Sequence, residues 1–156
     1  MNKISWCLDK KNGFSFIDPN DDLANAYIKK AEDALRAASD LQNNPDWEIS
    51  SSYYAMYFSL YAILMKIGVK SEIHSCTIAF MRELLKDFFQ EEEILLIEKA
   101  QKARIDVQYY SDRNISDELF GKIKGQRALF VARCKDLLNL LTEENVQRIR
   151  GALRGF

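Results

Sequence analysis

The segment from Lys102 to Arg113, KARIDVQYYSDR, holds the side chains of this chain that are best suited to bind a ligand. Within seven residues it places a guanidinium, a carboxylate, an amide and two phenols, from Arg104, Asp106, Gln108, Tyr109 and Tyr110. Residues four apart share one face of a helix, so Arg104 and Gln108 can contact one anion while Tyr110 flanks the pocket. The segment is therefore a candidate anion site, with Asp106 in support. The alternative is a buried polar network in which Arg104 pairs with Asp106 or with a carboxylate of a neighbouring helix.

Aromatic side chains and the single histidine form a second group of candidates. His74 lies in KSEIHSC, near the expected start of a helix, where a neutral imidazole commonly bonds a backbone group or packs at the edge of a core. A catalytic or ligand-binding role is its alternative. Tyr53, Tyr54, Tyr57 and Tyr61 are expected to fill a core or a dimer seam, the alternative being a platform on which nucleobases stack.

Signatures of ordinary enzymes are absent. The chain has no Gly-rich phosphate loop, no GxSxG elbow, no HExxH pair and no EF-hand loop, and one histidine leaves little material for a catalytic triad or a di-iron centre. Three widely spaced cysteines, Cys7, Cys76 and Cys134, with no CxxC motif, argue against a disulfide framework and a structural zinc site. We expect no metal, no cofactor and a reducing, cytoplasmic compartment.

Composition indicates one ordinary globular domain, expected to span residues 1–156. The chain is 47% hydrophobic and 29% charged, and its net charge of −1 creates no global field for nucleic acid or an anionic membrane. The basic end QRIRGALRGF is expected to be a solvated helix end, with a nucleic-acid or acidic-partner tail as its alternative. No signal-peptide core is evident, and the uncharged run of 17 residues from Ile49 to Met65 falls short of the ~20 that a membrane span needs.

Hydrophobic periodicity predicts an all-α, up-down bundle of four to five helices. After a leader at 1–17, the first helix is expected to be capped by Asp18 and to reach Leu41. The second, from about Trp47 to Ile67, is apolar all round and therefore central, and Gly68 ends it.

The remaining helices are expected to begin at short polar signals. The third starts at Ser71 or Ser75, the fourth carries Glu91 in its first turn, the fifth is capped by Ser116, and Thr142 caps a short basic helix at 142–156. The segment that contains Arg104 lies on the fourth of these helices.

The segment SSYYAMYFSLYAILMKIGVKSEIHSCTIAFMRELL, together with SWCL before the first helix and AR-x-x-x-x-YY on the fourth, resembles the HEPN superfamily, and most closely its small stand-alone archaeal and bacterial members. The resemblance covers roughly residues 5 to 141. It implies a helical bundle, usually a homodimer, and many members are metal-independent ribonucleases with an Arg-x(4-6)-His motif. In that motif Arg holds the scissile phosphate and His moves the proton of the ribose 2′-hydroxyl.

In this chain Arg104 matches the arginine of the motif, but Tyr109, Tyr110 and Ser111 occupy the histidine window. A phenol with a pKa near 10 is a poor base at neutral pH, so Tyr109 is better suited to donate a hydrogen bond to phosphate or ribose. Nothing in the spacing requires His74 to reach this site.

The resemblance leads us to expect a non-catalytic or weakly catalytic HEPN homodimer that binds a nucleotide, RNA or a minimal nucleotidyltransferase in a toxin–antitoxin or defence-like pair. Phosphate would meet Arg104, Gln108, Tyr109 and Tyr110, with Tyr53 and Tyr54 in support. The alternatives are an active ribonuclease that uses Arg104 with His74 or Tyr109, and a purely structural interaction protein.

Overall fold

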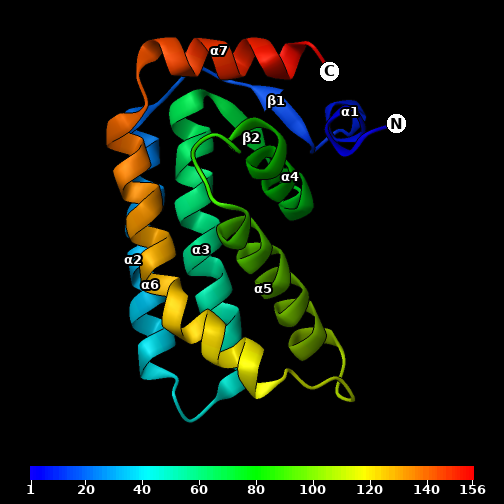
Figure 1. Cartoon of the computed structure of the whole chain (residues 1–156), viewed down its shortest axis with the longest axis vertical. Coiled ribbons are helices and arrows are strands. Elements are labelled where there is room, and N and C mark those ends of the chain that lie inside the picture. Colours follow the sequence, from blue (N-terminus) through cyan, green and yellow to red (C-terminus); the bar gives the residue numbers. More distant parts are fainter.

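The computed structural model describes all residues 1–156 and consists almost entirely of helices (Figure 1). In chain order the elements are α1 (Lys3–Asp9), β1 (Phe14–Phe16), α2 (Asp21–Asp40), α3 (Pro45–Ile67), β2 (Val69–Ser71), α4 (His74–Leu84), α5 (Glu91–Tyr109), α6 (Asp117–Leu140) and α7 (Glu143–Arg154). The all-α expectation is confirmed. The periodicity did not predict α1 or the two short strands, which pair antiparallel with Phe14 opposite Ser71.

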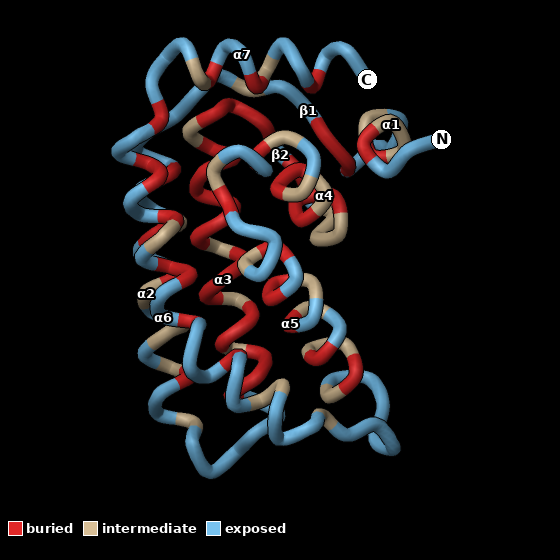
Figure 2. Tube along the Cα trace, in the orientation of Figure 1, coloured by how far each residue is buried: buried red, intermediate tan, exposed pale blue.

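Helix α3 is the centre of the molecule. It packs against α2, α4, α5, α6 and α7, and most of its residues are buried (Figure 2). An all-round apolar sequence predicts this position, because no face of such a helix is better placed in water. No helix is both long enough and apolar enough to cross a membrane.

The C-terminal end of α3 shows why a glycine is needed there. Gly68 adopts a left-handed conformation with φ of 84°, as predicted for a residue that ends a helix. Arg150 of α7 donates from Nη1 to the carbonyl oxygens of Ile17, Ile67 and Gly68 at 2.6–3.0 Å. Arg150 therefore caps α3, and the expectation that the basic end is only a solvated helix terminus does not hold for this residue.

Local capping signals were predicted with mixed success. Ser116 and Thr142 cap α6 and α7 as expected, by accepting from Leu119 N and Asn145 N. The helix start at Asp18 was wrong, because Asn20 caps α2, with Leu23 N donating to its Oδ1 at 2.8 Å.

The start of α4 was also mispredicted. Ile73 occupies the N-cap position and offers no side-chain acceptor, so neither Ser71 nor Ser75 caps this helix. Ser71 belongs to β2, and its hydroxyl donates to the carbonyl of Ile73 at 3.2 Å. The first residue of α4 is His74, whose ring points into the contact between α3 and α4.

A disulfide joins Cys7 of α1 to Cys76 of α4, with Cα atoms 5.8 Å apart. The argument from cysteine spacing against a disulfide framework missed this bond, because α1 packs on α4 and brings together residues 69 positions apart in sequence. Cys134 remains a free, buried thiol, and burial raises its pKa to about 12. The cysteine pattern therefore no longer argues for a reducing compartment.

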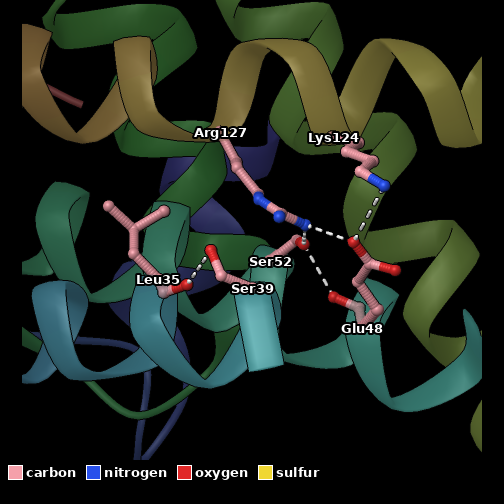
Figure 3. Close-up of polar contacts among 6 residues, drawn as sticks. All are labelled: Leu35, Ser39, Glu48, Ser52, Lys124 and Arg127. Atoms are coloured by element: carbon pink, nitrogen blue, oxygen red, sulfur yellow. Dashed lines mark hydrogen bonds and ion pairs between the residues drawn. The ribbon is translucent and has the colours of Figure 1, made fainter. Parts of the chain in front are cut away.

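A buried ion pair links α3 to α6 (Figure 3). Arg127 Nη1 donates to Glu48 Oε1 at 2.9 Å and to Ser52 Oγ at 3.0 Å, and Lys124 Nζ lies 3.9 Å from the same carboxylate oxygen. Only 1% of Glu48 and 7% of Arg127 is exposed. The charges of Glu48 and Arg127 therefore balance each other within the protein and are not solvated by water.

Candidate functional site

Helices α3, α4 and α5 bring together a set of polar and aromatic side chains that we call the Arg104 cluster. It consists of Tyr53 and Tyr54 from α3, His74 from α4, and Arg104 and Gln108 from α5. The i, i+4 spacing of Arg104 and Gln108 predicts their shared face. The position of His74 follows only from the packing of α4 on α3.

Arg104 is half-buried and carries its charge without an acidic partner. Its Nη1 donates to Gln108 Oε1 at 3.0 Å and lies 3.5 Å from the Tyr54 hydroxyl. Its Cζ lies 5.0 Å from the Tyr53 ring centre and 5.6 Å from that of Tyr54, within cation–π range. Its Nε is buried and has no hydrogen-bond partner, and Arg104 takes part in none of the ion pairs of the structure. Such a guanidinium is suited to bind an anion.

His74 lies against the same two tyrosines. Its Nδ1 is 2.8 Å from the Tyr53 hydroxyl, its ring stacks on Tyr57 with centres 3.9 Å apart, and it meets Tyr54 edge-on. Burial, and then the positive charge of Arg104, lower the pKa of His74 to about 4. The imidazole is therefore neutral at pH 7.

Asp106 does not belong to the Arg104 cluster. Its carboxylate accepts from Lys102 at 2.6 Å and from Arg113 at 2.8 Å, and these hydrogen bonds hold its pKa below the usual range. The alternative in which Arg104 pairs with Asp106 is therefore wrong. The two residues are only two positions apart, so they point to different sides of α5.

Tyr109 and Tyr110 lie at the end of α5, apart from Arg104. They are 71% and 43% exposed, and the Arg113 guanidinium stacks on the Tyr110 ring at 3.6 Å. With Gln108 and Asn114 they line a polar hollow of about 470 Å³. No hydrogen bond or cation–π contact joins either phenol to Arg104. Gln108 is the residue shared by this hollow and the Arg104 cluster.

Comparison with protein families identifies the family of the chain. The model of the HEPN domain matches residues 24–149. The chain belongs to the HEPN domain family. The match includes every residue of the Arg104 cluster and both phenols, so the resemblance of the sequence to HEPN proteins is confirmed. No curated protein matches the chain.

As a HEPN domain, the chain departs from the ribonuclease motif at the histidine position. The residues that fill the window after Arg104 stand at the C-terminal end of α5, where Tyr110 is already extended, with φ of −131°. The imidazole near Arg104 is instead His74, from a different helix. Sequence reasoning named His74 only as a weak candidate, because no local pattern links α4 to α5. It also missed Tyr57 as the ring that supports the imidazole.

Proposed function

We propose that this HEPN protein binds the phosphate of a nucleotide or of RNA at the Arg104 cluster. The observation that carries the proposal is the absence of a carboxylate beside Arg104, whose buried Nε lacks a partner. A half-buried positive charge without an acidic partner is costly, and a bound phosphate would both neutralise it and accept its N–H groups. The broad assignment to nucleotide- or RNA-related function follows from the family; the residues are our proposal.

The neighbouring groups support an anionic, aromatic ligand. Gln108 is exposed and accepts from Arg104 through its oxygen, which leaves its amide N–H groups free to donate to a ligand. Tyr54 is partly exposed and stacks on Phe58 at 5.6 Å, so an aromatic surface borders the guanidinium. Bases stack on such rings with little dependence on sequence. Tyr109 and Tyr110 could contact such a ligand only if it extended past Gln108 into the polar hollow that they line.

Catalysis is absent or weak in this proposal. The motif histidine is missing, and Tyr53 occupies Nδ1 of the nearby imidazole. A metal-independent ribonuclease that uses Arg104 and His74 is the second candidate, and their shared contact with Tyr53 and Tyr54 is the observation that favours it. Cleavage of single-stranded RNA by the purified protein in EDTA, lost in His74→Ala, would establish the second candidate.

We propose that the protein is a homodimer. Trp47, Tyr54 and Phe58 recur every four or seven residues along one side of α3, and Trp47 is 57% exposed. On that side α3 is bordered by Lys30 of α2 and by Arg104. Two copies packed along this stripe would hide its aromatic surface and bring both Arg104 clusters to one cleft.

Finer parts of the proposal rest on the family alone. They are a minimal nucleotidyltransferase as partner and a toxin–antitoxin or defence-like role. A cytoplasmic location, expected from the cysteine spacing, loses that support with the Cys7–Cys76 disulfide and stays a proposal. The division into one domain over 1–156 is also a proposal; it is supported by a continuous core that includes Ile4 from α1 and Ile149 from α7.

Calorimetric titration with ATP and with a short single-stranded RNA tests the proposed function. Arg104→Ala should weaken binding by roughly 10- to 150-fold, the usual worth of a charged hydrogen bond. Lys102→Ala is the matched control. It also removes a cation from α5, but Lys102 pairs with Asp106 and does not belong to the Arg104 cluster. Absence of binding by the parent protein, or equal losses in the two variants, would refute the proposal.

A further inference from the structure

The hydrogen bond between Tyr53 and His74 has a defined direction. Tyr53 is fully buried, and burial keeps the pKa of its phenol above the usual range, so the hydroxyl carries its proton. His74 Nδ1, at 2.8 Å, is the only hydrogen-bond partner of this hydroxyl. If Nδ1 were the donor, the phenolic hydrogen would be buried without an acceptor. Tyr53 therefore donates to Nδ1.

This direction determines the state of the other ring nitrogen. A neutral imidazole with an accepting Nδ1 carries its hydrogen on Nε2. Nε2 has no partner within the chain and is not among the buried unpartnered atoms, so it is open to a ligand. The titratable groups around the ring are the phenols of Tyr53, Tyr54 and Tyr57 on α3 and the guanidinium of Arg104 on α5, and no carboxylate contacts it.

We propose that Tyr53 is a positioning residue that holds His74 as the Nε2–H tautomer, and that His74 Nε2–H and Arg104 together donate to one phosphodiester group. The inference rests on the proposed function and names its ligand chemistry. Both donors lie against Tyr53 and Tyr54, although they come from α4 and α5. One donor is charged and the other neutral, which suits the single negative charge of a diester.

The tautomer can be tested without any ligand. Because the chain has one histidine, a long-range ¹H–¹⁵N spectrum shows one imidazole. At pH 7 we expect the signals of an Nε2–H tautomer, with a titration midpoint well below the ordinary value of about 6.5. An Nδ1–H tautomer, or an ordinary midpoint, would overturn the inference whatever the protein binds.

Two phenylalanine variants separate positioning from packing. Tyr53→Phe removes the donor to Nδ1, so the imidazole should become a mixture of tautomers with a higher midpoint. Tyr57→Phe is the matched control, because its ring stacks on His74 while its hydroxyl contacts Thr77 at 3.5 Å. It should leave the tautomer unchanged. Backbone amide spectra of both variants check that they fold, and a tautomer unchanged in folded Tyr53→Phe contradicts the positioning role.

The phosphate contact is tested with the dinucleoside monophosphate ApA, a diester that does not titrate between pH 6 and 8. Saturation with ApA should shift the Nε2 signal, and Tyr53→Phe should weaken binding roughly two- to tenfold, as expected for one neutral hydrogen bond. If ApA binding depends on Arg104 but leaves the Nε2 signal unshifted, only the donor role of His74 is refuted. No ApA binding, with the expected tautomer and with binding of ATP or RNA retained, would refute the phosphodiester contact but not the proposed function. Loss of all three ligands would refute the proposed function as well.

Discussion

Arg127 and Glu48 form an ion pair that is almost completely shielded from water, with Nη1 2.9 Å from Oε1, whereas Arg104, on the neighbouring helix α5, has no acidic partner. The two arginines therefore differ in what their removal leaves behind. Loss of Arg127 leaves a buried carboxylate with only Lys124, 3.9 Å away, to balance it. Loss of Arg104 leaves neutral groups only.

We predict that these arginines contribute very different amounts to stability. Arg127→Ala should lower the free energy of unfolding by about 3–5 kcal/mol, because it leaves Glu48 buried and unpaired. Arg104→Ala should change it by less than about 1 kcal/mol, since no charge is left unpaired. Urea unfolding of both variants measures the difference. The double variant Glu48→Leu with Arg127→Met is the control and should recover most of the loss.

Stability should depend on pH through His74. Its pKa is about 4 when folded and about 6.5 when unfolded, so the unfolded chain binds more protons between these values and stability falls as pH is lowered through this window. Between pH 7 and pH 5 the free energy of unfolding of the parent protein should fall by about 1–2 kcal/mol more than that of His74→Gln, which has no titratable group at this position. Equal losses, measured by urea unfolding at both pH values, would show that His74 titrates normally.

Reduction of the Cys7–Cys76 disulfide should destabilise the protein. The bond closes a long loop, since the cysteines are 69 positions apart, and bonds of this kind typically contribute about 2–4 kcal/mol. Unfolding curves with and without reductant measure this contribution, and the double variant Cys7→Ser with Cys76→Ser should be insensitive to reductant. Alkylation of the denatured, unreduced protein should modify Cys134 alone. Modification of all three cysteines would contradict the pairing.

The proposed dimer predicts a specific effect of charge on α3. Phe58→Arg should give a monomer, because it places a cation in the aromatic stripe beside Lys30, which already lies 5.3 Å from the Phe58 ring. Leu129→Arg, on the exposed side of α6, serves as the control and should remain dimeric. Light scattering at about 50 μM distinguishes the two states, and a monomeric parent protein would remove the proposed shared cleft.

Features that depend on neighbours a few residues away were predictable from the sequence. The all-round apolar pattern of α3 predicted its central position, and Gly68, Ser116 and Thr142 end or begin their helices as expected. The Arg104–Gln108 contact also follows from the helical repeat. In each case the decisive interaction lies within four or five positions, so the local sequence contains both partners.

Only the tertiary structure decided how residues far apart in sequence meet. His74 joins the Arg104 cluster because α4 packs on α3, and a second contact, of α1 with α4, closes the Cys7–Cys76 bond. Asp106 gains Arg113 as a partner because the chain beyond the end of α5 folds back to it. Such contacts depend on the angle and rotation at which helices pack, which are set by many side chains at once. No single motif in the sequence contains that information. The sequence has one imidazole, and the fold decided that it lies beside Arg104.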